Sequence, residues 1–303
     1  MFKPKLKENI RKKLVSELYI VQFWSYLSSN SNAIHILEKN LDKVNWSWLS
    51  RNSNAMHILK KNPDKIDLEE LCANKNTNVI RFLEENYLVN LENFSKICWF
   101  NLSNNPNSIH ILEKNLDKIN WNCLSGNKNA IHILEKNIYN INWDYLSINP
   151  NAIHILEKNL DKVKWDSLCK NPNAIHILEK NLDKINWDYL SINPNAMHIL
   201  EKNLDKINWF NLSKNTSAIY LLEKNLDKIN WDILCKNPNA IHLLEKNLDK
   251  INWDILSCNP NAIHLLEKNL NKINSKYIIC LAINENPNIL NLLFDYEYVL
   301  FDV

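Results

Sequence analysis

The stretch NPNAIHILEKNLDKINW, Asn171–Trp187, decides the fold because nearly the same string recurs along the chain. Close copies begin at Asn149, Asn193, Asn237 and Asn259. Eight tryptophans follow one another at intervals of 22 residues: Trp99, Trp121, Trp143, Trp165, Trp187, Trp209, Trp231 and Trp253. A fixed period of this length is typical of solenoids and other repeat arrays. One such unit is too small to bury its apolar faces alone, so each copy must form part of the core of the next.

The repeat extends over most of the chain but is interrupted once. Trp24 and Trp46 keep the interval, Leu68 takes the next slot, and nine extra residues precede Trp99. The last unit, from Asn286, is degenerate. We therefore divide the chain into an N-terminal helical cap with a basic start (1–23), repeats (24–75), a degenerate repeat with insertions (76–98), eight regular repeats (99–274), and a degenerate C-terminal capping repeat with a tail (275–303).

Apolar residues within one unit follow helical spacing. Ile175, Leu178 and Leu182 lie at i, i+3 and i+7. This pattern predicts a helix of roughly nine residues, with Asn171 as its N-cap and Asn181 ending it in a left-handed conformation. A second, shorter helix is expected at each tryptophan, and an asparagine directly before the tryptophan suits its N-cap.

A leucine-rich repeat is the β-containing alternative for units of this length. Aligning its ladder asparagine with Asn181 places Asn173, His176 and Asp183 where apolar residues are required. The sequence therefore predicts an all-α protein, an α-solenoid of short two-helix 22-residue repeats. We expect a right-angled or superhelical rod with modified end caps, because an uncapped end would expose core.

Composition excludes several classes of protein. The chain has 303 residues, 46% of them hydrophobic, and 36 basic against 34 acidic residues give a net charge of +2. This balance disfavours nucleic acid as a partner. We find no secretory signal and no run of about 18 apolar residues, so we expect no membrane association. Cys72, Cys169 and Cys235 occupy a slot where other units have serine, which indicates reduced thiols in the cytoplasm.

Repeated residues offer little for chemistry. The histidines share one slot, and equivalent slots on stacked helices lie about 8–10 Å apart, too far to share a zinc ion. A single glycine, Gly126, leaves no phosphate loop. We predict no catalytic residues, no metal site and no cofactor, and hence no enzyme. The eight regular tryptophans are predicted to be the structural repeat core, because Leu68 can replace one.

Variation between units gathers at two slots. The second residues after tryptophan are Asn101, Cys123, Tyr145, Ser167, Tyr189, Asn211, Ile233 and Ile255. The fifth residues are Asn104, Gly126, Ile148, Lys170, Ile192, Lys214, Lys236 and Cys258. In a solenoid each series becomes a line along the surface, and such extended faces bind partners. Neutral drift at exposed sites would give the same pattern. The candidate partner-binding residues are Tyr145, Lys170, Tyr189, Lys214, Ile233, Lys236 and Ile255.

The unit NWDYLSINPNAIHILEKNLDKV, Asn142–Val163, resembles the tandem-repeat proteins of unknown function that amoeba-infecting, mimivirus-like giant viruses encode in multiple copies. The resemblance covers about Trp24 to Phe294, and the ending LFDYEYVLFDV is also similar to that group. It implies a viral origin and a role in the infected host cell, and it carries over no binding or catalytic residue. The interruption at 76–98 departs from the pattern and is either a hinge or a binding feature.

Together these observations predict a non-enzymatic scaffold for protein–protein interaction, acting on a host or viral protein. We expect a monomer or weak self-association, in the host cytoplasm or associated with the virion. The alternative is a repeat protein that reads single-stranded RNA or DNA, one base per unit.

Overall fold

The computed structural model describes residues 2–14, 17–89, 94–274, 277–283, 286 and 288–298. The chain divides into two compact units, each described by itself below. Unit 1 comprises Met1–Val79 and Ile241–Val303, and unit 2 comprises Ile80–Ala240. Both are built from short helices in a repeating order, which confirms the prediction of an all-α repeat solenoid.

Each repeat has a first helix at the tryptophan, a second helix at the histidine and, in most copies, a 3₁₀ turn. The first helices of unit 2 are α9 (Trp99–Asn104), α11 (Trp121–Gly126), α13 (Trp143–Ile148), α15 (Trp165–Leu168), α17 (Trp187–Leu190), α19 (Trp209–Leu212) and α21 (Trp231–Leu234). The second helices are α10 (Ile109–Glu113), α12 (Ile131–Lys136), α14 (Ile153–Glu157), α16 (Ile175–Glu179), α18 (Met197–Glu201) and α20 (Ile219–Glu223). The 3₁₀ turns are η3 (Leu116–Lys118), η4 (Ile138–Asn140), η5 (Leu182–Lys184), η6 (Leu204–Lys206) and η7 (Leu226–Lys228).

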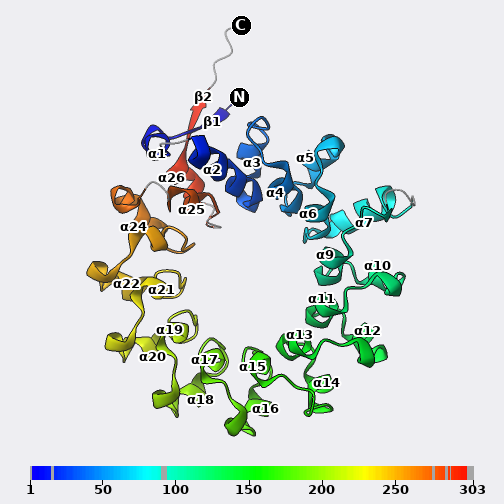
Figure 1. Cartoon of the computed structure of the whole chain (residues 1–303). Coiled ribbons are helices and arrows are strands. Elements are labelled where there is room, and N and C mark those ends of the chain that lie inside the picture. The colour runs from blue at the N-terminus through cyan, green and yellow to red at the C-terminus, as the bar shows by residue number, and fades with distance from the viewer. Residues whose placement is uncertain are drawn as a thin grey trace. The chain divides into compact units, whose positions relative to one another are not determined.

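Unit 2 is a curved row of these repeats. Figure 1 shows the first helices along its concave side and the second helices along its convex side. The helix α7 (Thr77–Asn86) begins in unit 1 and ends in unit 2. It covers much of the interrupted repeat at 76–98, of which residues 90–93 lie outside the described residues.

The second helix is shorter than the sequence pattern predicts. It begins at Ile175, after Ala174, because Asn171 is part of a turn in which its side chain accepts a hydrogen bond from the Asn173 amide. The expected left-handed ending is also wrong, since Asn181 has φ −137°. After this ending the chain changes direction, and Leu182 is 50% exposed instead of buried.

The core of each repeat consists of alanine, isoleucine and leucine. Ala174, Ile177 and Leu178 are buried on the second helix, and Leu168, three residues after the tryptophan, is fully buried on the first. All eight regular tryptophans are of intermediate exposure, so they border the fully buried residues of the repeat. Each indole stands at the start of a helix of four to six residues. In several repeats the lysine that follows the second helix covers one face of the indole of its own repeat, as Lys184 does 4.6 Å from the centre of Trp165.

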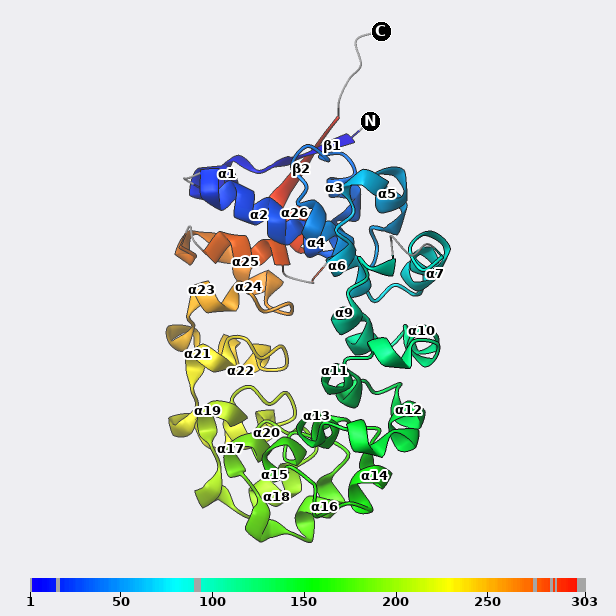
Figure 2. The same cartoon turned by 45° about the vertical axis from the view of Figure 1, so that its right-hand side comes forward.

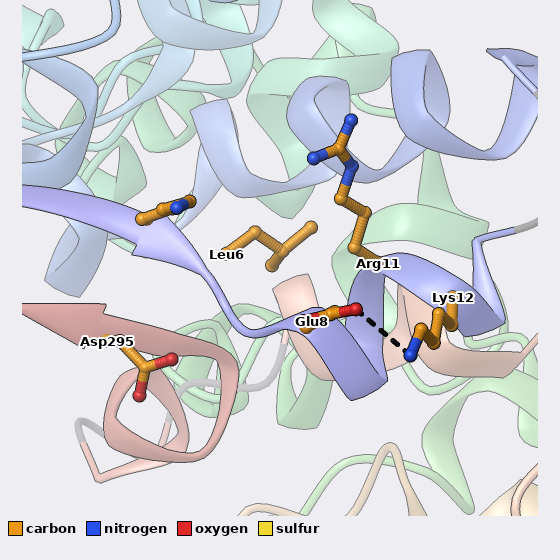
Figure 3. Close-up of a pocket in the computed structure, with 6 residues that line it drawn as sticks. Leu6, Glu8, Arg11, Lys12 and Asp295 are labelled. Atoms are coloured by element: carbon orange, nitrogen blue, oxygen red, sulfur yellow. Dashed lines mark ion pairs between the residues drawn. The ribbon is translucent and has the colours of Figure 1, made fainter.

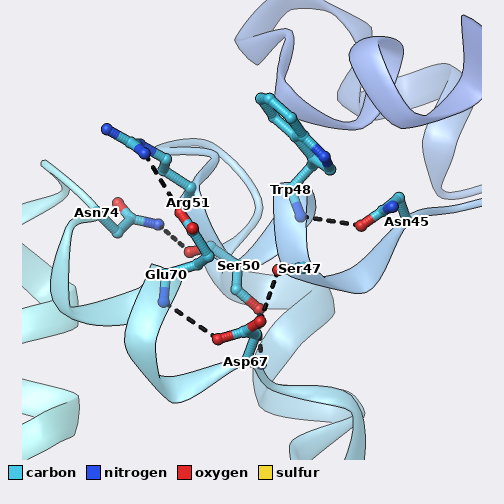
Figure 4. Close-up of polar contacts among 8 residues, drawn as sticks. All are labelled: Asn45, Ser47, Trp48, Ser50, Arg51, Asp67, Glu70 and Asn74. Atoms are coloured by element: carbon cyan, nitrogen blue, oxygen red, sulfur yellow. Dashed lines mark hydrogen bonds and ion pairs between the residues drawn. The ribbon is translucent and has the colours of Figure 1, made fainter. Parts of the chain in front are cut away.

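A ladder of buried asparagines joins successive repeats. Asn171 Nδ2 donates to the Ser147 carbonyl at 3.0 Å and to the Asn149 carbonyl at 3.0 Å, both in the preceding repeat. Figure 4 shows the same bond in unit 1, from Asn74 to the Ser50 carbonyl at 2.8 Å. These bonds satisfy side chains that would otherwise be costly to bury, and they fix how one repeat sits on the next.

A serine forms a second bridge at most junctions. The Ser191 hydroxyl donates to the Trp187 carbonyl at 2.7 Å and accepts from the Asn208 amide of the next repeat at 3.1 Å. The first of these bonds stays within one helix and the second crosses the junction. The slot shared by serine and cysteine therefore accepts a hydrogen bond, and smallness is not its only requirement.

Unit 1 contains repeats from both ends of the chain. Its N-terminal helices are α1 (Glu8–Lys13), α2 (Glu17–Ser29), η1 (Ser31–Ala33), α3 (Ile34–Leu37), α4 (Trp46–Arg51), α5 (Met56–Lys61), η2 (Pro63–Lys65) and α6 (Leu68–Cys72). Its C-terminal helices are α22 (Ile241–Glu245), η8 (Leu248–Lys250), α23 (Trp253–Leu256), α24 (Ile263–Lys268), η9 (Leu270–Lys272), α25 (Ile278–Ile283) and α26 (Ile289–Leu293).

The modified ends pack on each other. Helix α2 lies against α25 (Figure 2), and Asn30 Nδ2 donates to the Ala282 carbonyl at 3.0 Å, as ladder asparagines do elsewhere. The ring of the buried Phe294 lies 6.2 Å from that of Phe23 and 6.1 Å from that of Trp24. The first and last repeats thus cover each other's apolar faces by the contact that joins neighbouring repeats.

Two antiparallel strands complete this contact. Strand β1 (Phe2–Leu6) pairs with β2 (Phe294–Tyr298), and the register places Lys3 opposite Glu297 and Lys5 opposite Asp295. The basic start of the chain therefore faces the acidic residues near its end. A pocket beside the strands is lined by Lys5, Leu6, Glu8, Arg11, Lys12 and Asp295 (Figure 3). Lys12 Nζ lies 2.9 Å from Glu8 within it.

Candidate protein-interaction surface

Six of the seven candidate residues lie on the first helices of unit 2, or directly after them, and these helices form its concave side (Figure 1). Tyr145 is half exposed, at 50% of its surface, while Tyr189 and Ile233 are half-buried. Lys214 and Lys236 are exposed. The seventh residue, Ile255, belongs to unit 1.

The two variable series meet at the junctions between repeats. Lys170, in the fifth position of one repeat, places Nζ 3.7 Å from the ring centre of Tyr189, in the second position of the next. Two repeats earlier in the chain, the same two positions are held by Gly126 and Tyr145, and a Cβ on Gly126 would lie 3.8 Å from the Tyr145 ring. The series therefore form one surface line instead of two, and we call residues Gly126, Tyr145, Ile148, Lys170, Tyr189, Ile192, Lys214, Ile233 and Lys236 the variable line.

Cations and aromatic rings are paired on this side of the repeats. Besides Lys170 on Tyr189, Lys214 Nζ lies 4.6 Å from the ring centre of Phe210. A lysine over an aromatic face is attracted by the ring quadrupole. Phe210 is 47% exposed and belongs to a slot that sequence reasoning passed over. The signal was available, because most repeats place aspartate or another polar residue there.

Aspartates in that same slot have a structural role. Asp188 accepts a hydrogen bond from Asn208 Nδ2 at 2.7 Å, and Asp166 accepts one from Asn186 Nδ2 at 3.0 Å. Asn186 is in turn the N-cap of α17, where its side chain accepts from the Tyr189 amide, as predicted. The aspartate thus links the start of one first helix to the start of the next. Its carboxylate accepts the hydrogen bond that joins the two repeats.

Histidines on the second helices contact glutamates of the preceding repeat. His176 Nε2 lies 2.8 Å from Glu157 of the preceding repeat, and His198 Nε2 lies 2.6 Å from Glu179. The same pairing joins His57, His110, His132, His154 and His264 to glutamates. The histidine side chains are about half exposed, so this pairing is a surface contact that links each repeat to the previous one.

The cysteines are arranged as packing residues. Burial raises the pKa of the Cys169 thiol, and burial followed by the proximity of Cys98 raises that of Cys123, so both stay protonated at neutral pH. None of the seven cysteines, all of which lie among the described residues, forms a disulfide. Among the described residues, no three histidine, cysteine, aspartate or glutamate side chains converge as metal ligands. No helix in the described ranges is long and apolar enough to cross a membrane.

No protein-family model, curated protein or solved structure matches this chain. The order of the helices defines the class of the protein, a helical repeat solenoid.

Proposed function

We propose that the protein is a non-enzymatic scaffold that binds a protein partner, of host or viral origin, along the variable line. The proposal rests on one observation: the constant slots of the repeat hold neighbouring repeats together, and the variable slots lie elsewhere. Slots that stay constant are occupied by inter-repeat bonds: the asparagine ladder, the serine bridge and the histidine–glutamate pairs. Variation is concentrated on an exposed line that runs from repeat to repeat.

Tyrosine side chains are the expected anchors of the contact. Aromatic residues supply large contact area at low entropic cost and are enriched in interface hot spots. Tyr145 is exposed and Tyr189 lies beneath the Lys170 ammonium, so one repeat offers an open ring and the next-but-one a ring with a cation. This spacing suits an elongated partner surface that contacts several repeats at once.

The test is affinity purification of the tagged protein from infected and uninfected host cells, followed by mass spectrometry. Tyr145→Ser combined with Tyr189→Ser should release the partner. The matched control is Tyr139→Ser combined with Tyr220→Ser, because these tyrosines are 100% and 60% exposed but lie off the variable line. Equal recovery of the partner with both double variants would refute the assignment of the surface.

Single-stranded nucleic acid is the second candidate. The lysine–aromatic pairs at Tyr189 and Phe210 favour it, because a base stacks on an aromatic ring while a cation meets the phosphate. The net charge of +2 disfavours it, since phosphate contacts supply most non-specific affinity. Nuclease treatment before purification separates the two: partners that disappear with nuclease would support this candidate and contradict the protein scaffold.

A further inference from the structure

A row of leucines is exposed at the connectors between repeats. In unit 2 these are Leu116, Leu160, Leu182, Leu204 and Leu226, with exposed fractions of 45%, 43%, 50%, 41% and 44%. Each follows the second helix of its repeat and leads to the first helix of the next. The one repeat that lacks leucine has Ile138 and the fully exposed Tyr139. We call the five leucines the leucine row.

Single exposed leucines are ordinary on protein surfaces. Here, however, the neighbours of each leucine have structural roles that the leucine lacks. Asn181 Nδ2 donates to the Ile177 carbonyl at 2.8 Å, Lys184 covers the Trp165 ring, and Ile185 is buried. Leu182 lies between them with half of its surface open. A half-exposed leucine returns in five of the six successive repeats from Leu116 to Leu226, so the leucines form a periodic ridge instead of a scattered set.

Charges along the leucine row are balanced. Every leucine is followed by aspartate and lysine, so the five leucine connectors carry five acids and five bases. Some of these are close to each other already, as Lys118 Nζ is to Asp117 at 3.0 Å, and this contact holds the pKa of Asp117 below its ordinary value. A balanced ridge gives no long-range attraction for an anionic lipid surface or a nucleic acid. A second ridge of the same composition would meet it without net repulsion.

The distance between successive repeats restricts which partner can contact the whole leucine row. Neighbouring repeats place equivalent residues roughly 8–10 Å apart, so the five leucines, which extend over five repeat intervals, span at least about 40 Å. A partner that contacts all of them must present apolar groups at this same interval. A second copy of this chain does so by construction, and a two-fold contact uses the same patch on both copies.

We propose that unit 2 carries a self-association surface, on which the leucine row of one chain docks against the leucine row of a second chain. A strip about 40 Å long needs a width of about 20 Å to bury about 800 Å² per chain, the size of an ordinary specific interface. With a leucine, an aspartate and a lysine per repeat the strip is partly polar, so the dimer is reversible. This surface is distinct from the variable line, and its test does not depend on the proposed partner.

The experiment is sedimentation velocity of the full chain over a concentration range from micromolar to several hundred micromolar. The proposal requires a reversible monomer–dimer equilibrium. Leu160→Ser combined with Leu182→Ser should raise the dissociation constant at least tenfold. The control is Ile148→Ser combined with Ile192→Ser, which removes side chains of similar exposure, 40% and 36%, from the variable line and should change the constant less than twofold.

Three outcomes would overturn the proposal: a monomer at every concentration, a dimer that the leucine variant leaves unchanged, or equal weakening by the control. Circular dichroism and tryptophan emission establish that each variant is folded. Should the double leucine variant fail to fold, Leu160→Ser and Leu182→Ser are measured singly, and each should still weaken the dimer more than Ile148→Ser does.

Discussion

Replacing one ladder asparagine should destabilise the solenoid far more than replacing its neighbour in the same turn. Asn171 is fully buried, donates to two carbonyls of the preceding repeat, and accepts from the Asn173 amide at 3.0 Å. The Asn149 carbonyl keeps a bond from the Ala152 amide after Asn171→Ala, whereas the Ser147 carbonyl loses the bond from Nδ2. Burying a carbonyl without its partner costs about 1–3 kcal/mol, and each of the other two lost bonds costs about 1 kcal/mol.

The expected loss for Asn171→Ala is therefore roughly 3–5 kcal/mol in the free energy of unfolding. The matched control is Asn173→Ala. Asn173 is exposed and donates one side-chain bond, to the Pro150 carbonyl at 2.9 Å, so its loss should cost about 0.5–1 kcal/mol. Urea titrations followed by tryptophan emission measure both changes, provided that the slope of the transition is unchanged. Costs for the two variants that agree within about 0.5 kcal/mol would refute the ladder as the source of stability.

Three further predictions address other contacts. Phe294→Ala should destabilise unit 1 by about 3–5 kcal/mol, because the ring is 2% exposed, and hydrogen exchange should accelerate in unit 1 before unit 2. A double-mutant cycle of His176→Gln and Glu157→Gln should give a coupling below about 1 kcal/mol that shrinks in high salt, and a larger, salt-independent value would contradict a surface pair. Ser191→Val should cost about 1–3 kcal/mol, because it leaves the Asn208 amide unpaired. Ser191→Cys should cost less, since cysteine fills the same slot at Cys169. Urea midpoints of the two variants measure this difference.

The period of the sequence was enough to predict the solenoid and the two-helix repeat, because a repeat too small to fold alone must stack. It was also enough to place the N-cap at Asn186, since that asparagine directly precedes a short apolar segment. The second helix was misplaced for a local reason. Asn171 suits an N-cap and a turn equally well, and its ladder bonds to the preceding repeat decide for the turn.

Contacts between distant segments were not available from the pattern. The sequence marks both ends as different from the repeat, but it does not say that Asn30 donates to Ala282, because that bond joins residues 252 positions apart. The exposure of Leu182 was missed for a related reason. Helical spacing assigns it to the apolar stripe of a nine-residue helix, and only the actual end of α16 at Glu179 turns it outward.

The variable line shows where sequence and structure each contribute. Aligning the repeats is enough to find the slots that vary, since the constant asparagine, serine and histidine slots are held by bonds to a neighbouring repeat. The contact of Lys170 with Tyr189 depends in addition on the pitch of the stack, which brings residues 19 positions apart within 3.7 Å. A change at either residue therefore alters the same spot on the surface. Partner selection should thus follow the pair at each junction and not the single residue, so Lys170→Ala should weaken binding as Tyr189→Ser does.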